Sequence, residues 1–152
     1  MTALFDLIKT ILNRLEGWAS YNLMTLGARF AVSFPFWSSG RSKEGGEFLS
    51  MSKYAIMPFE NDYNVPFFAP ETAAKLALYG ETFLPLMLVL GLGARVASAG
   101  LLVMVGVITI SYSGHSFIES MSWLVALIAI LLAGPGQWSV DHLIRKQVYK
   151  GA

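Results

Sequence analysis

Residues 70–95 read PETAAKLALYGETFLPLMLVLGLGAR, and residues 96–113 continue with VASAGLLVMVGVITISYS. Ionisable residues are rare in this stretch, and the glycines on either side of position 92 divide it into two long apolar runs. A run of about 20 apolar residues can cross the hydrocarbon core of a bilayer as a helix. We therefore predict two consecutive membrane spans, at about 73–91 and 95–113.

The composition of the whole chain agrees with this interpretation. Of the 152 residues, 55% are hydrophobic and only 14% are charged, whereas soluble domains are roughly a quarter charged. Two further apolar stretches, at about 20–38 and 117–134, complete a set of four, the last of them short. The sequence predicts an all-α integral membrane protein, a bundle of four transmembrane helices (20–143) with both termini on one side.

The first residues differ from the rest in their pattern. Between residues 3 and 18 apolar side chains recur at helical spacing among charged ones, which is typical of an amphipathic helix that is too polar to span. These charges also interrupt the apolar core that a cleavable signal peptide needs. We expect an interfacial helix over 1–19; the alternative is a polar helix packed on the protein's own body. Residues 144–152 are expected to form a cytoplasmic tail.

The lysines and arginines indicate the orientation, because cytoplasmic loops carry an excess of them. With both termini in the cytoplasm, the inner side has Lys9, Arg14, Arg95, Arg145, Lys146 and Lys150, and the outer side has Arg41, Lys43, Lys53 and Lys75. This modest excess favours cytoplasmic termini, and an even number of spans is the firmer inference. The long loop at about 39–72, rich in aromatic residues and proline, is then outside and is expected to lie over the bundle mouth, partly buried.

Two charges lie deep inside the predicted spans, Arg29 in the first and Glu81 in the second. A charge at the centre of a membrane helix costs about 2.5–3.5 kcal/mol on insertion scales, so each should face the interior and find a partner. In antiparallel neighbours both would lie near mid-membrane, where an ion pair is geometrically allowed. Such a pair either sets the register of the helices or forms a polar site for a quinone head group, a proton or a small ligand.

Four more residues are candidates for ligand contacts: the aromatic residues Trp37, Tyr63 and Tyr79, and His115 in the short loop between spans three and four. His115 could also join Glu60 and Asp62 in a metal site, although a solvated loop residue is the simpler interpretation. The chain has no cysteine, which excludes disulfides, thiolate metal sites and thiol–disulfide exchange within it. We expect no resident metal.

Several motifs in order along the chain resemble the DoxX family of small bacterial membrane proteins. The resemblance rests on Arg29, on FWSSGR at 36–41 with Lys43, on FENDYNVP at 59–66, on the block at 70–95, on His115 and Trp123, and on GPG-x-x-S-x-D at 134–141. It implies a four-helix membrane bundle. The family name comes from a resemblance to a subunit of an archaeal thiosulfate:quinone oxidoreductase, and some members look like accessory parts of membrane redox complexes or of stress and metal-response systems.

These observations lead to a functional expectation: a membrane subunit of a redox-linked system that binds quinone or a small ligand near Arg29 and Glu81. No haem, flavin or iron–sulfur motif is present, so the chain has no intrinsic cofactor, and electrons would need quinone or a partner subunit. One rival is a non-catalytic accessory subunit that packs against a larger membrane complex or a second copy; another is a permeability factor that acts as an oligomer. A net charge of +1 gives no indication of nucleic-acid binding.

Overall fold

The structure is a computed structural model of the whole chain, and it describes residues 2–15, 18–63, 65, 67–111 and 117–150. The described residues form helices and no strand, apart from one isolated bridge between Glu44 and Met51. The all-α prediction is confirmed. The elements are α1 (Thr2–Leu15), α2 (Trp18–Ser42), the 3-10 helix η1 (Lys53–Ala55), α3 (Met57–Asn61), α4 (Pro70–Leu90), α5 (Ala94–Ser111), α6 (Phe117–Ala133) and α7 (Val140–Lys150).

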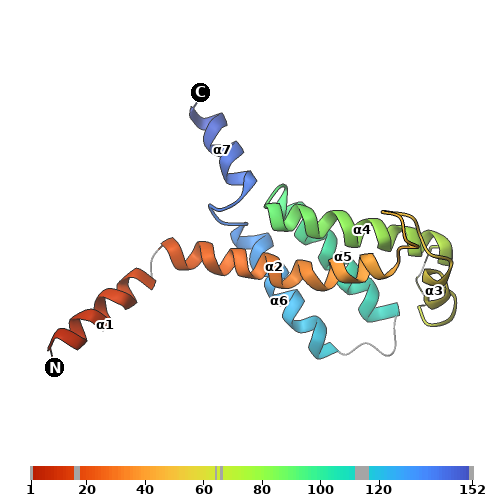
Figure 1. Cartoon of the computed structure of the whole chain (residues 1–152), viewed down its shortest axis with the longest axis horizontal. Coiled ribbons are helices and arrows are strands. Elements are labelled where there is room, and N and C mark those ends of the chain that lie inside the picture. Colours follow the sequence, from red (N-terminus) through yellow and green to blue (C-terminus); the bar gives the residue numbers. More distant parts are fainter. Residues whose placement is uncertain (1, 16–17, 64, 66, 112–116, 151–152) are drawn as a thin grey trace.

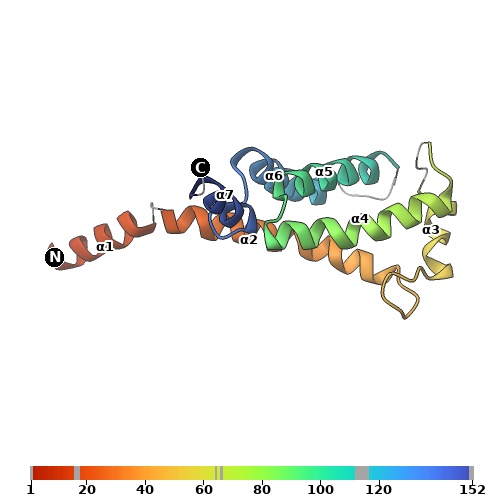
Figure 2. The same cartoon turned by 90° about the horizontal axis from the view of Figure 1, so that it is seen from above.

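Four helices form the body of the molecule. Helix α2 packs against α4, α4 against α5, α5 against α6, and α6 back against α2. The four helices form two layers: α2 and α4 make one layer, and α5 and α6 make the other (Figures 1 and 2). Their shared core consists of aliphatic and aromatic side chains: Val32, Phe36, Leu88, Ala94, Ala97, Leu101, Val105, Leu127 and Ile130.

The four predicted spans correspond to these four helices, with revised ends. Helix α2 begins at Trp18 and continues through Pro35 to Ser42, one turn beyond the predicted end at residue 38. Helices α4 and α5 are long and apolar enough to cross a membrane, and the shorter apolar part of α6 covers Ser120–Ala133. The crossing of the membrane by α2 and α6 stays a prediction.

The two terminal helices extend from the end of the bundle opposite α3 (Figure 1). Helix α1 projects from the body with its apolar side chains exposed, Phe5 at 70% among them. These exposed side chains argue against the alternative of a helix packed on the body, and the position of α1 at the membrane interface stays a prediction. Helix α7 runs from Val140 to Lys150, so the expected boundary at 143/144 lies inside a helix, and the cytoplasmic position of residues 144–152 stays a prediction.

The long connection between α2 and α4 folds against the start of α4. Phe59 of α3 is buried against Ala73 and Ala74, and Tyr63 and Val65 pack on the same cluster. The prediction of a partly buried loop is therefore confirmed. Other aromatic side chains of this connection are more than half exposed: Phe48, Tyr54, Phe67 and Phe68.

Candidate ligand site beside a buried ion pair

Arg29 and Glu81 are both buried, as expected, but they do not bind each other. The side chain of Glu81 accepts a hydrogen bond from Lys43 at 2.6 Å, and this contact is an ion pair. Arg29 instead donates to two backbone oxygens, that of Val89 at 3.2 Å and that of Trp138 at 2.6 Å. The predicted Arg29–Glu81 pair is wrong.

The register of α2 against α4 explains the difference. The antiparallel helices place Arg29 beside Val89 and Ser33 beside Pro85, whose backbone oxygen accepts a bond from the Ser33 hydroxyl. Glu81 then lies beside Gly40, where an added Cβ would come within 3.2 Å of the Glu81 Cβ. Positions 29 and 40 are about 16 Å apart along a helix, so the two charges lie at different depths in the bundle.

Arg29 belongs to the end of the bundle from which α1 and α7 extend. Its side chain is completely buried, and its bonds connect α2 to the end of α4 and to the segment before α7. The opposite charge that acts on it comes from Asp141, whose carboxylate accepts bonds from the backbone N–H groups of Gly93 and Ala94. These contacts join α2 to α4 and to the segment before α7 at this end of the bundle, and a role of Arg29 in ligand binding stays a prediction.

Glu81 and Lys43 lie near the other end. The chain turns after α2, and Lys43 folds back so that its ammonium group also donates to the hydroxyl of Ser39 at 2.9 Å. The backbone of Lys43 is held by Ser52, whose N–H donates to the Lys43 oxygen. Only 16% of the Lys43 side chain and 5% of the Glu81 side chain are exposed. These contacts fix the position of the Lys43 ammonium group, although Lys43 itself lies one residue after the end of α2.

A second cation lies close by but faces a different group of side chains. The guanidinium of Arg41 contacts the faces of Trp37 and Phe48, at 4.5 and 4.8 Å from the ring centres, and pairs with Glu44 at 2.6 Å. It also donates to the hydroxyl of Thr82. Trp37 is thus occupied by a cation–π contact, and Arg41 is a fixed part of the contact between α2 and α4.

The ion pair forms the polar part of a mostly apolar cavity of about 260 Å³. Tyr63, stacked on Phe59 with ring centres 5.0 Å apart, contributes to its wall from the connection. The other walls come from α2, from the rest of the connection including α3, and from α4 and α5. The cavity is lined by Ser39, Lys43, Phe59, Tyr63, Val65, Phe68, Ala73, Leu76, Ala77, Glu81, Val103, Met104, Val107 and Ile108. An apolar cavity with a few convergent polar groups is the usual form of a small-molecule site.

The sequence-based candidates separate into two groups. Glu81 and Tyr63 meet in this cavity, whereas Trp37 lines a separate groove and Tyr79 stacks on Phe83 at the outer surface of α4. His115 lies outside the described residues. No group of three metal-ligating side chains occurs in the described part of the chain, and the carboxylates of Glu60 and Asp62 line a hollow outside the cavity.

The residue that sequence reasoning missed as a site residue is Lys43, which it used only for orientation and for the family resemblance. The available signal was its spacing of four from Ser39, one helical turn, combined with a glycine at position 40 that allows close approach of another helix. Asp141 was likewise given no role beyond the motif that contains it.

No curated protein and no solved structure matches the chain. A family model does match, and its range includes Arg29, Lys43, Tyr63 and Glu81 but ends before α6 and the segment at 134–141. The model is that of DoxX and matches residues 24–115, more than half of the chain, so the protein belongs to the DoxX family of membrane proteins.

Proposed function

We propose that this protein is the membrane subunit of a redox-linked system and binds a quinone, or a small molecule of similar polarity, beside Lys43 and Glu81. The observation that carries the proposal is the buried ion pair in the wall of an apolar cavity. A charge pair that only linked two helices would not need an adjoining space. Here the ammonium and the carboxylate border a volume that a ligand can fill.

The size and chemistry of the cavity fit a substituted ring. An apolar cavity of about 150 Å³ accepts benzene, and the volume here is larger. Lys43 can donate a hydrogen bond to a carbonyl oxygen, and Glu81 can exchange a proton with the corresponding hydroxyl of the reduced ring. Electrons would pass to or from a partner subunit, because the chain offers only binding groups and a proton carrier.

The rim of the cavity favours entry from the bilayer. Leu76 on α4 and Val103 on α5 line it and are 52% and 67% exposed, and the exposed Phe68 completes an apolar border. A molecule dissolved in lipid would therefore meet apolar surface before it reached the ion pair. This proposal assumes that α2, α4, α5 and α6 all span the membrane.

Ligand content tests the proposal directly. The protein is purified in mild detergent, extracted, and assayed for quinone by mass spectrometry, together with Lys43→Met and Glu81→Gln. We expect about one quinone per chain in the native protein and loss in both variants. The matched control is Lys75→Met, which breaks an exposed ion pair of the same 2.6 Å length, to Glu71 on the same helix. Absence of quinone from the native protein, or equal loss in the control, would contradict the proposal.

The topology has its own test, since the chain contains no cysteine that would need to be removed. Single cysteines replace two exposed lysines, Lys53 in η1, which contacts α3, and Lys146 in α7; α3 and α7 lie at opposite ends of the bundle (Figure 1). In intact cells we expect an impermeant thiol reagent to label Lys53→Cys, and to label Lys146→Cys only after permeabilisation. The reverse pattern would contradict cytoplasmic termini, and labelling of both would contradict three spans between the two positions.

A second candidate is the non-catalytic accessory subunit, and α1 is the observation that favours it. Its exposed apolar side chains, including Leu4, Phe5 and Ile8, project beyond the body, where they can lie on the membrane surface or against another chain. Removal of residues 2–15 separates the two functions. An accessory subunit would lose its companion chain, whereas a ligand-binding protein would keep its quinone.

A further inference from the structure

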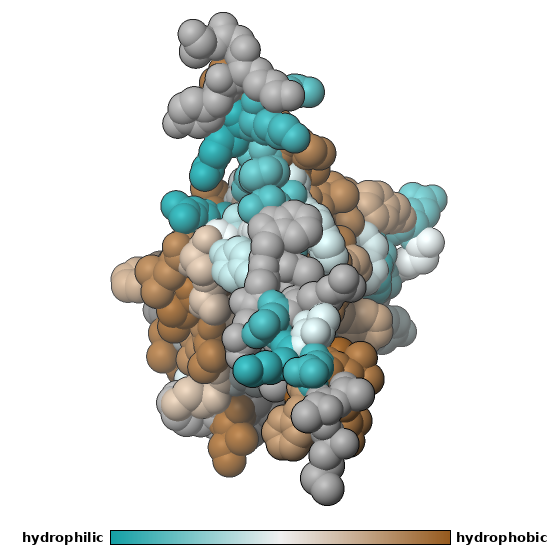
Figure 3. Space-filling model, turned by 90° about the vertical axis from the view of Figure 1, so that its left-hand side faces the viewer, coloured by the Kyte–Doolittle hydropathy of each residue, from teal (hydrophilic) through white to brown (hydrophobic). Residues whose placement is uncertain are grey.

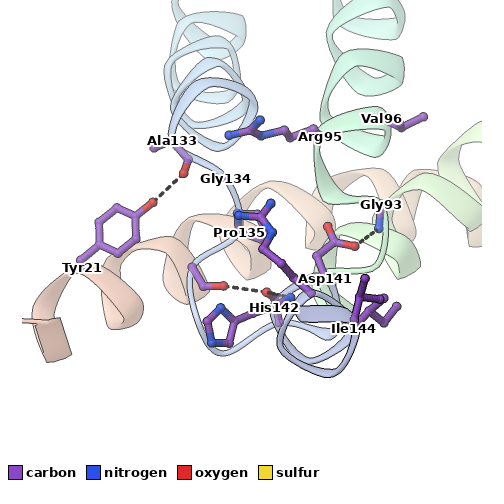
Figure 4. Close-up of a pocket in the computed structure, with 14 residues that line it drawn as sticks. Tyr21, Gly93, Arg95, Val96, Ala133, Gly134, Pro135, Asp141, His142 and Ile144 are labelled. Carbon is purple, nitrogen blue, oxygen red and sulfur yellow. Dashed lines mark hydrogen bonds between the residues drawn. The ribbon is translucent and has the colours of Figure 1, made fainter. Parts of the chain in front are cut away.

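A second cavity, of about 490 Å³, lies at the end of the bundle that carries the termini. Figure 4 shows Tyr21 of α2 and Arg95 of α5 on either side of the end of α6, with Asp141 and His142 on the α7 side. Arg145 of α7 is also part of the lining. This cavity is separate from the one beside Lys43 and shares no residue with it.

The charges around the cavity favour an anion. Arg95 and Arg145 contribute two cations, and within the described part of the chain neither makes an ion pair. The one carboxylate of the lining, that of Asp141, already has hydrogen-bond partners. Its two oxygens accept hydrogen bonds from the backbone N–H groups of Gly93 and Ala94 at 2.7 and 3.0 Å. Among the residues that the structure describes, the guanidinium of Arg95 makes one long bond, 3.2 Å to the backbone oxygen of Leu132, and its other donors bond to none of them.

The sides of the cavity are apolar where they meet the outer surface. Val96 on α5 and Ile144 and Val148 on α7 belong to the lining and are 70%, 48% and 65% exposed. Figure 3, which views this end of the molecule, shows polar side chains along α7 and apolar side chains on the flanks. Cationic groups and apolar surface therefore adjoin at one site, which suits a ligand with an anionic head and an acyl chain.

We propose that this cavity binds the phosphate group of an anionic phospholipid, with Arg95 and Arg145 as its donors. Guanidinium groups bind phosphate with two parallel hydrogen bonds, and basic pockets between membrane helices are known to accept lipid head groups. The exposed faces of Val96, Ile144 and Val148 lie where the acyl chains of the lipid would leave the site. The bound lipid bridges α5 and α7.

The test measures lipid retention by native mass spectrometry of the detergent-purified protein, titrated with phosphatidylglycerol or phosphatidylcholine. Phosphatidylglycerol should bind more tightly, and Arg145→Gln should weaken it about fivefold, the effect of one basic residue at a lipid surface. The matched control is Lys146→Gln, which removes the same charge from the next position of α7 but not from the cavity lining. The control should retain the native affinity.

Three outcomes would overturn the proposal: equal affinity for the two lipids, equal weakening by Lys146→Gln, or complete displacement of phosphatidylglycerol by millimolar inorganic phosphate. The last result would assign the site to free phosphate. Arg145 makes no hydrogen bond within the described residues, so its replacement tests binding without removing a contact of the fold; a melting curve checks this. Arg145 does not line the cavity beside Lys43, so Arg145→Gln should leave quinone content unchanged, and this site and the quinone site can fail independently.

Discussion

The ion pair between Lys43 and Glu81 gives the sharpest prediction about stability. Lys43→Met keeps the length and much of the volume of the side chain but leaves the carboxylate of Glu81 buried without its cation. At 2.6 Å and an effective dielectric constant of about 20, two unit charges attract each other by about 6 kcal/mol. Desolvation offsets much of that attraction, and removal of one partner from a buried pair typically costs about 3–5 kcal/mol. We expect a loss of stability in that range.

The assay is unfolding by SDS in mixed micelles, followed by the fluorescence of the four tryptophans. Lys75→Met serves as the control, because its ion pair with Glu71 is mostly exposed, 53% and 62% for the two side chains, and exposed pairs contribute little. The double variant Lys43→Met/Glu81→Leu should recover most of the loss, since apolar replacement of both partners removes the unpaired charge.

Two results would refute this reasoning. If Lys43→Met were no more harmful than Lys75→Met, the carboxylate of Glu81 would be solvated and the cavity would not be a low-dielectric site. If the double variant were less stable than Lys43→Met, the loss would come from packing and not from an unpaired charge. The pH dependence gives a further check. The loss of unfolding free energy in Lys43→Met, relative to the native protein, should become smaller in acid, because protonation of Glu81 neutralises the unpaired carboxylate.

Three further predictions concern the closed end of the bundle. Gly91 has a φ of +68° and its added Cβ would meet Arg29 at 2.5 Å, so Gly91→Ala should lower the free energy of unfolding by at least about 1 kcal/mol; Gly106→Ala, with open space around it, should raise it by about 0.5–1 kcal/mol. Equal effects on the melting temperature would contradict this. Arg29→Lys should lose about 1.5–3 kcal/mol, because an ammonium cannot replace the forked guanidinium between two carbonyls; a native melting temperature would argue against the observed bonds. Asp141→Ala should cost about 0.5–2 kcal/mol and speed hydrogen exchange at the start of α5, and unchanged exchange there would show that the carboxylate is not needed as a cap.

The helices could be predicted because their signals are local. The apolar runs at 73–91 and 95–113 correspond to α4 and α5 within a few residues, since the length of an apolar run and the glycines that end it are properties of neighbouring residues. Burial of Arg29 and Glu81 was also predictable, because a charge within an apolar helix has to turn away from lipid. Membership of the DoxX family was predictable as well, because the motifs that indicate it are short and follow one another in order along the chain.

The partners of those charges were not predictable from spacing. Which residues meet depends on the register of α2 against α4, and that register depends on a close approach at Gly40. Lys43 reaches Glu81 only because α2 continues to Ser42 and the next residues fold back toward α4.

The sequence by itself thus determined where helices form, which charges are buried and to which family the chain belongs. Only the tertiary structure decided that Glu81 and Lys43 line one cavity. It alone also decided that Arg29 donates a hydrogen bond to the backbone oxygen of Trp138, 109 residues away in the chain. The physical reason is the range of the interactions. Helix formation and burial follow from apolar and polar residues within one segment, whereas ion pairs and cavities require side chains from separate segments to come within a few ångströms of each other.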